Sequence, residues 1–403
     1  MAEKYQVVTH DLSKREKAPL EFLNEDVAKS TLAFHSSFDQ YEKTPLVELK
    51  NLAGYLGLKN AFIKDESYRF GLNAFKVLGG SYAIGKYIAE LLGKDLDDLP
   101  YSKLISDEVK KELGDVTFIT ATDGNHGRGV AWTAMELKQK SIVYMPKGSA
   151  TERLENIRAC GSKAEIKDMN YDECVRLCNS EAEEFGYVMV QDTAWEGYED
   201  IPTWIMQGYT TMAYEAYLDL EAKGVKPTHI FLQAGVGSMA SAVTGFFSSV
   251  YKGDDKPVIT VVEPEKANCI FKTAKADDGQ LHFVTGDMDT IMAGLACGEP
   301  CTIGWDVLSS YAEHYLSVPD DSAAHGMRVL GNPLGDDKRV ISGESGAATL
   351  GVVSQIMEKP ELAEFKEALG LDENSVVLFF STEGDTDAKN YRDIVWNGKN
   401  PNL

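Results

Sequence analysis

The chain has 403 residues, 43% of them hydrophobic and 10% aromatic, so it can bury the cores of two or three domains. Its 40 basic and 63 acidic residues give a formal net charge of −23. So negative a chain is a poor partner for nucleic acid or an anionic membrane, and we exclude both. The N-terminus lacks the apolar core of a signal peptide, and no apolar run approaches the roughly 18 residues of a membrane-spanning helix. We therefore expect a cytoplasmic protein.

The middle of the chain alternates short β-rich runs with amphipathic helical stretches. This alternation predicts βαβ units and parallel sheets. We expect an α/β fold with two open, twisted, mostly parallel sheets flanked by helices. A small α/β domain would cover residues 98–192, and a large domain would combine residues 1–97 and 193–403. Strands are predicted over residues 117–120, 141–146, 164–169, 187–192, 228–235, 258–264 and 375–384, and helices over about 125–138, 150–159 and 171–185.

Six cysteines in a chain of this length do not make a disulfide framework. Cys174 and Cys178 share one face of a predicted helix, and Cys297 and Cys301 have the same spacing around a turn. The seven histidines add no cluster at metal-ligand spacing. We predict buried, apolar cysteines and no metal site.

Ligands of such folds gather at the carboxyl ends of the strands. The loop Gly235–Ser238, which includes Val236, follows an apolar strand and opens a helix. Gly235 and Gly237 let the backbone approach a ligand closely, and the free N–H groups of a helix start bind anions. There is no Walker lysine and no complete G-x-G-x-x-G pattern, so a single phosphate group fits best. The alternative is a plain strand-to-helix turn.

Lys76 lies where a helix is predicted to begin, with Asn73 as the capping residue. The helix start and burial beside Phe75 and Val77 are expected to lower the pKa of this lysine. A lysine with a lowered pKa attacks carbonyl groups, which predicts a Schiff base to an aldehyde cofactor. The alternative is an ordinary surface lysine.

A third loop follows the strand 117–120 and contains Thr122, Asp123, Gly124 and Asn125. Its N–H groups and polar side chains can bind a carboxylate, although a capped turn would have the same composition. A reactive lysine, a phosphate cradle and a carboxylate-binding loop together fit pyridoxal phosphate carrying an amino acid. We therefore predict a small amino-acid substrate.

These loops resemble those of the tryptophan-synthase-β-like enzymes, the fold type II group of pyridoxal-phosphate enzymes. Serine and threonine dehydratases of that group carry an Asn-x-x-Lys motif, matched by Asn73–Lys76, and a Ser-Ser-Gly-Asn-His loop, matched by Thr122–His126. Their glycine-rich phosphate loop is matched by Gly235–Ser238. Longer stretches between about His35 and Trp396 are similar to the diaminopropionate ammonia-lyases: residues 63–76, 121–132, 144–153, 189–198, 201–209, 289–300, 325–333, 342–348 and 381–387.

The resemblance implies a homodimer that eliminates ammonia from both enantiomers of 2,3-diaminopropionate. Lys76 would hold the cofactor, Asn125 would meet its phenolic oxygen, and Thr382 would face its pyridine nitrogen. Asp192 would contact the amino end of the substrate, or would merely cap its loop. Glu344 would either approach the same pocket or cap a helix.

Asp123 stands where the dehydratases have a second serine. A carboxylate there would repel the carboxylate of the substrate, unless the substrate brings an extra cation or Asp123 acts as an acid or base. A serine or threonine dehydratase of the same fold, the nearest alternative, offers that carboxylate no partner. A non-catalytic binding protein would not need the lysine with both loops. A nicotinamide enzyme would need an acidic residue about 20 residues after a glycine fingerprint, and that residue is lacking.

Overall fold

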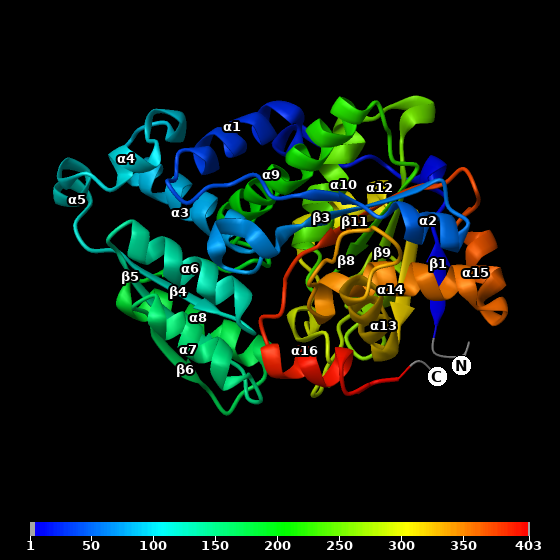
Figure 1. Cartoon of the computed structure of the whole chain (residues 1–403). Coiled ribbons are helices and arrows are strands. Elements are labelled where there is room, and N and C mark those ends of the chain that lie inside the picture. The colour runs from blue at the N-terminus through cyan, green and yellow to red at the C-terminus, as the bar shows by residue number, and fades with distance from the viewer. Residues whose placement is uncertain (1–4, 402–403) are drawn as a thin grey trace.

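The computed structural model describes residues 5–401 and shows an α/β fold with two separate sheets (Figure 1). Within these residues the larger sheet has seven strands in the order β1-β10-β9-β8-β11-β3-β2, and the smaller has four in the order β6-β5-β4-β7. All pairs are parallel except β1–β10 and β2–β3 at the edges of the larger sheet. The predicted fold class is confirmed. The strands are β1 Gln6–Thr9, β2 Leu46–Glu48, β3 Asn60–Asp65, β4 Thr117–Ala121, β5 Lys140–Met145, β6 Lys163–Ile166, β7 Val188–Met189, β8 His229–Gln233, β9 Val258–Pro264, β10 His314–Val318 and β11 Val376–Ser381.

Helices cover both sheets. Three helices, α6, α7 and α8, pack against the smaller sheet, while α2, α11 and α14 pack against strands of the larger one. In Figure 1 the smaller sheet and its helices form the lower left part of the molecule. The α-helices are α1 Glu25–Ser36, α2 Lys50–Leu56, α3 Val77–Leu91, α4 Tyr101–Leu104, α5 Asp107–Leu113, α6 Asn125–Glu136, α7 Thr151–Ala159, α8 Tyr171–Phe185, α9 Asp200–Lys223, α10 Ser238–Val250, α11 Cys269–Ala276, α12 Thr302–Tyr311, α13 Asp320–Gly331, α14 Glu344–Glu358, α15 Ala363–Ala368 and α16 Ala388–Val395.

Every strand and helix predicted from the sequence is present, with boundaries that move by at most three residues. The predicted runs are apolar because parallel strands are buried on both faces. Strand β11 illustrates this: Leu378 and Phe380 pack into one core, whereas Val377 and Phe379 pack into the core on the opposite face. This strand lies in the middle of the larger sheet, between β8 and β3.

The chain leaves the larger sheet through α3 and returns to it through α9, and these two helices pack closely. A Cβ atom on Gly208 would lie 2.4 Å from the carbonyl oxygen of Leu78. A Cβ atom on Gly79 would lie 2.6 Å from the ring of Tyr209. Glycine at both positions therefore allows a contact that fixes the start of α3 against α9.

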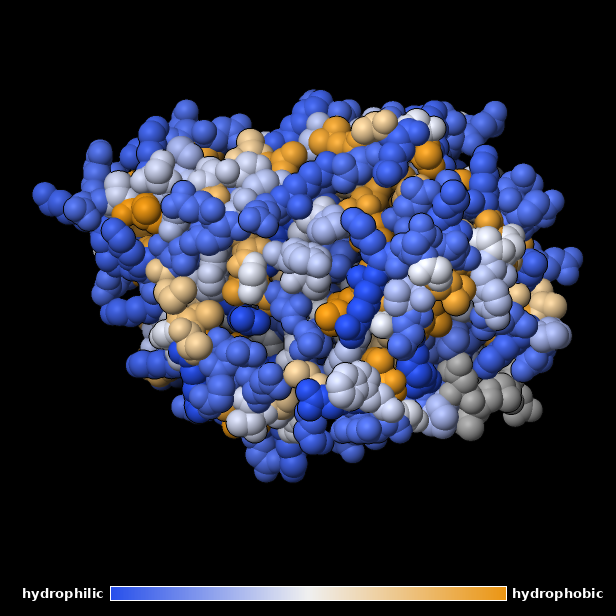
Figure 2. All heavy atoms as spheres, viewed as in Figure 1, coloured by the Kyte–Doolittle hydropathy of each residue, from blue (hydrophilic) through white to orange (hydrophobic). Residues whose placement is uncertain are grey.

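The surface agrees with the composition. The face in Figure 2 is mostly hydrophilic, with hydrophobic residues in small scattered groups. No helix within residues 5–401 combines the length and apolar character needed to cross a bilayer. All six cysteines are buried with free thiols, as predicted.

Candidate active site

A cavity of about 1150 Å³ is lined by residues from both sheets. The loops that form it follow the carboxyl ends of β4, β7, β8 and β11, which is where parallel sheets place ligands. Gly124 is the one predicted site residue outside the lining. The other predicted site residues all line this one cavity: Lys76, Thr122, Asp123, Asn125, Asp192, Gly235, Val236, Gly237, Ser238 and Thr382.

Lys76 is delivered to the cavity by the start of α3, as expected, but the predicted cap is wrong. The helix begins at Val77, and Lys76 itself occupies the capping position with φ −61°. Asn73 has φ +60°, and its amide donates a hydrogen bond of 3.1 Å to Asp385. A capping residue directly precedes the first helical residue, and Asn73 lies four positions before Val77. Its side chain instead ties the residues before Lys76 to the loop after β11.

The amino group of Lys76 lies 2.6 Å from the carboxylate of Asp192. The Lys76 side chain is 17% exposed and that of Asp192 is 4% exposed. Burial is the largest single effect and would lower the pKa of Lys76, but the charges of Asp192, Tyr209 and Asp123 and the hydrogen bond to Asp192 together outweigh it and raise the pKa. The reciprocal effect of Lys76 lowers the pKa of Asp192 against the effect of its burial. The predicted lowered lysine pKa is therefore wrong for this structure. Asp192 was expected to contact the substrate, but its direct contact with Lys76, 116 residues away in the chain, was not predicted.

Asp192 also lies beside polar groups of the smaller sheet. The ring nitrogen Nδ1 of His126 is 3.9 Å from the Asp192 carboxylate, and Nε2 donates to the carbonyl of Val190 at 2.7 Å. Burial lowers the pKa of His126, which favours the neutral ring, although the charge of Asp192 acts in the opposite direction. The Tyr171 hydroxyl and the Gln191 amide lie 3.4 and 3.3 Å from the second carboxylate oxygen.

Asp123 has a cationic neighbour that sequence reasoning missed. The guanidinium of Arg153, on α7, lies 3.3 Å from the Asp123 carboxylate, and the Arg153 side chain is only 8% exposed. Burial would lower the pKa of Arg153, but the nearby carboxylates of Glu383, Asp123, Glu344 and Asp387 together outweigh it and raise the pKa. Gly124 makes room for this arginine, since a Cβ atom there would lie 2.7 Å from Arg153 Cδ. Arg153 can therefore offset the repulsion between Asp123 and a substrate carboxylate, so a second cation on the substrate is not the only group that could do so.

Asn125 and Glu344 lie near a buried glutamate that was also missed. The amide of Asn125 donates a 2.6 Å hydrogen bond to Glu383, which also accepts from the backbone N–H of Ser345. Glu344 lines the cavity, as one of its two predicted roles requires. The other role, helix capping, is not observed, because Gly343 is the capping residue of α14 and the Glu344 carboxylate accepts a hydrogen bond from Asn390 instead. Burial and the charge of Glu383 raise the pKa of Glu344 to about 7.

The structure provides donors and space for pyridoxal phosphate. The Thr382 hydroxyl accepts a hydrogen bond of 2.8 Å from Gln233, which leaves its own proton free for an acceptor such as a pyridine nitrogen. Gly237 has φ +100°, which lets the loop before α10 turn its N–H groups to one side. The first N–H groups of α10 have no intrahelical acceptors. Ser238 is less free, because its hydroxyl donates to the Asp192 carbonyl oxygen at 2.5 Å.

Tyr209 is a further cavity residue without a predicted role. Its ring packs on Phe75 with centroids 4.8 Å apart, and its hydroxyl has no hydrogen-bond partner among the described residues. A buried hydroxyl without a partner is costly, so a bound group that reaches it would be favourable. These residues fit a phosphorylated aromatic aldehyde held at Lys76.

Comparison with known proteins gives a consistent result. Residues 38–381 match the family described as pyridoxal-phosphate dependent enzyme. The chain is 50% identical over 398 residues to a diaminopropionate ammonia-lyase of Salmonella typhimurium, with 98% of each chain covered.

Solved structures are similar as well. The diaminopropionate ammonia-lyase of Escherichia coli, solved with an aminoacrylate-PLP azomethine reaction intermediate, matches with a TM-score of 0.90 and 46% identity over 99% of this chain and 98% of that chain. Threonine deaminase isoform 2 of Solanum lycopersicum matches with a TM-score of 0.72 at 18% identity, over 96% of each chain, and shares the fold.

Proposed function

The chain belongs to the family of pyridoxal-phosphate dependent enzymes, and from this membership we propose that it is a carbon–nitrogen lyase acting on 2,3-diaminopropionate. The reaction consumes one water and gives pyruvate and two ammonia. The observation that carries the proposal is the meeting of Lys76 with two carboxylates, Asp123 and Asp192, in one cavity. A diamino acid brings an additional ammonium group that such carboxylates can bind, whereas a hydroxy amino acid does not.

The cofactor is pyridoxal phosphate. Lys76 would hold its aldehyde carbon, the Gly235–Ser238 loop would bind its phosphate, Asn125 would meet the phenolic oxygen, and Thr382 would donate to the ring nitrogen. When bound, the cofactor accepts the electron pair left on the substrate Cα atom after its proton is removed. A hydroxyl rather than a carboxylate at the ring nitrogen suits elimination over transamination.

The protein's own residues would handle the protons. Lys76 would remove the Cα proton of one enantiomer, and Asp123 would remove that of the other from the opposite face. Thr122, Asp123 and Gly124 would bind the substrate carboxylate, with Arg153 offsetting the charge of Asp123. Asp192 would bind an ammonium group and keep the leaving β-amine protonated.

The test is an absorbance spectrum followed by pyruvate release from each enantiomer of 2,3-diaminopropionate, with serine and threonine alongside. We expect a yellow protein whose colour is lost in Lys76→Ala, and pyruvate mainly from the diamino acid. A yellow protein that prefers serine or threonine would be a dehydratase. A protein that stays colourless with added cofactor would refute the proposal.

We also propose a homodimer in the cytoplasm. Residues 98–192 would form the small domain, and residues 1–97 with 193–403 the large one. The likeness to the ammonia-lyases over nearly the whole chain supports the homodimer, which the family resemblance implies. The four strands of the smaller sheet, which all lie between Thr117 and Met189, support the domain bounds. Light scattering after size-exclusion chromatography would measure the mass against that of the 44.3 kDa chain.

A further inference from the structure

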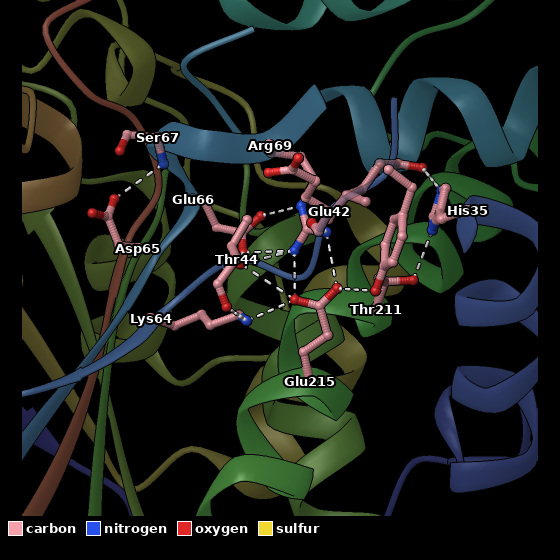
Figure 3. Close-up of polar contacts among 12 residues, drawn as sticks. His35, Glu42, Thr44, Lys64, Asp65, Glu66, Ser67, Arg69, Thr211 and Glu215 are labelled. Atoms are coloured by element: carbon pink, nitrogen blue, oxygen red, sulfur yellow. Dashed lines mark hydrogen bonds and ion pairs between the residues drawn. The ribbon is translucent and has the colours of Figure 1, made fainter. Parts of the chain in front are cut away.

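Four charged side chains form a buried ion cluster outside the cavity: Lys64, Glu66, Arg69 and Glu215 (Figure 3). None is more than 1% exposed, and none lines the cavity. Arg69 contacts both carboxylates: its Nε lies 2.8 Å from Glu66, and its Nη2 lies 2.8 Å from Glu215. Lys64 lies 2.6 Å from Glu215. Two cations and two anions make the cluster neutral.

Hydroxyl groups complete the hydrogen bonding of the cluster. Thr44 donates to Glu66 at 2.6 Å, and Tyr41 donates to Glu215 at 2.8 Å. Removing charges from water is costly, and apolar residues of similar size often stabilise a core equally well. Stability alone is therefore a weak reason for such a cluster. The cluster can instead serve to fix the positions of the backbone segments that carry its residues.

The cluster holds one end of an irregular segment that leads to Lys76. Glu66 and Arg69 belong to the 3-10 helix η4, Glu66–Gly71, which follows β3 and is broken by a kink at Arg69 and Phe70. Phe70 has φ +50° and Asn73 has φ +60°. Asparagine adopts this left-handed region with little cost, but a bulky residue such as Phe70 persists there only where the surrounding structure fixes it. The segment between Arg69 and Lys76 is therefore strained and needs anchors at both ends.

The far end of the segment is anchored to the loop after β11. The backbone N–H of Phe75 donates to the carbonyl of Thr382 at 3.0 Å, and the N–H of Gly384 donates to the carbonyl of Asn73 at 3.0 Å. At the near end, the anchor is Glu215 on α9. The same helix carries Tyr209, which lines the cavity and packs on Phe75. The cluster thus fixes the lysine segment to a helix that forms the cavity wall.

We propose that the buried ion cluster positions Lys76, and that Arg69 and Glu215 are positioning residues for the lysine that holds the cofactor. The inference rests on the proposed function, since it takes Lys76 to be that lysine. Without the Glu215 carboxylate, Arg69 loses two hydrogen bonds of 2.9 and 2.8 Å, and the strained segment loses its fixed end. Lys76 would then sample positions away from the cofactor carbon.

The test measures how fast added pyridoxal phosphate becomes bound to Lys76 in full-length, cofactor-free protein. Samples are reduced with borohydride at successive times, and the labelled Lys76 peptide is quantified by mass spectrometry. A misplacement of about 1 Å can cost on the order of 100-fold in rate, so we expect Glu215→Gln to slow capture by about 10- to 100-fold. Arg69→Lys, which keeps the charge but loses the planar fork, should slow it as well.

Asp337→Asn is the matched control. Asp337 is 8% exposed and accepts hydrogen bonds of 2.9 Å from the backbone N–H groups of Asn51 and Leu52, and none of these three residues lines the cavity or belongs to the lysine segment. This variant should lose stability and still capture the cofactor at the wild-type rate. Equal slowing in Asp337→Asn, at a matched loss of melting temperature, would overturn the proposal, because the effect would then be general destabilisation.

If Glu215→Gln fails to fold, milder variants of the cluster still test the proposal. Tyr41→Phe and Thr44→Val each remove one hydroxyl from the cluster, and each should slow capture and alter the visible circular dichroism per bound cofactor. Wild-type capture and dichroism in folded cluster variants would refute the positioning role. A wild-type protein that fails to label Lys76 would instead refute the proposed function, so the two failures are distinguishable.

Discussion

Asp192 holds the Lys76 amine protonated, and replacing it should speed the binding of an aldehyde at neutral pH. The amine must lose its proton before it attacks a carbonyl carbon. An opposite charge within about 4–6 Å typically shifts a pKa by about 1–3, and the Asp192 carboxylate lies at 2.6 Å. In Asp192→Asn that effect is lost while burial still lowers the lysine pKa. The unprotonated fraction at pH 8 should therefore rise by about 10- to 1000-fold.

The assay follows visible absorbance after pyridoxal phosphate is mixed with cofactor-free protein, from pH 7 to pH 10. Wild-type capture should rise with pH across the whole range, because its lysine titrates above the usual 10.5. The Asp192→Asn profile should level off at lower pH. Asp123→Asn is the comparison: Asp123 also raises the pKa of Lys76, but less than Asp192 does, so its profile should shift by less than that of Asp192→Asn. Slower capture by Asp192→Asn at every pH would refute the reasoning, because the carboxylate would then assist the reaction.

Three other changes have defined outcomes. Asp123→Asn should reduce pyruvate release from one enantiomer of 2,3-diaminopropionate far more than from the other, and equal losses would contradict the proposal of two bases. Glu344→Gln should stabilise the cofactor-free protein above pH 7. The folded-state pKa of about 7 exceeds the usual 4.5, so the free energy of unfolding of the wild type falls by up to about 3 kcal/mol as the pH rises between those values. Urea unfolding midpoints of both proteins at pH 5 and pH 8 would measure the difference. Gly237→Ala should weaken binding of pyridoxal phosphate and cost about 1–3 kcal/mol, because φ is +100° and the new Cβ would lie 3.2 Å from Ile270; unchanged affinity in a titration would contradict this.

The sequence predicts the parallel strands well because they are continuous apolar runs between amphipathic helices. Four strands of the larger sheet were not predicted, and each has a physical reason. Strands β1 and β2 are short edge strands in which apolar residues stand beside polar ones, so neither forms a continuous apolar run. Strand β3 ends in Lys64 and Asp65, and charged residues are typical of a surface turn. Both are buried here, and Lys64 belongs to the buried ion cluster. Strand β10 begins with a buried histidine, His314.

The residues of the candidate site could be predicted from the sequence, but their contacts with one another could not. Local signals, such as a glycine loop after a strand or a lysine near a helix start, identified eight residues that share one cavity, and the family resemblance added Asp192 and Thr382. What local signals cannot give is the partner of each charge. Asp192 beside Lys76 and Arg153 beside Asp123 are contacts across 116 and 30 residues, so the sign of the lysine pKa shift was wrong. The positive φ of Asn73 likewise depends on distant contacts with Gly384 and Asp385.

The central place of β11 in the larger sheet has a consequence for synthesis on the ribosome. Among the described strands it is the last in chain order, yet it separates β8 from β3. Until it emerges, β2 and β3 have no hydrogen-bonded link to the strands β8, β9 and β10. Thr382, which anchors the lysine segment, emerges with it. The nascent chain can therefore complete the smaller sheet early, but it cannot assemble the cavity until nearly 400 residues have been made, so cofactor binding would mark the end of folding rather than guide its beginning.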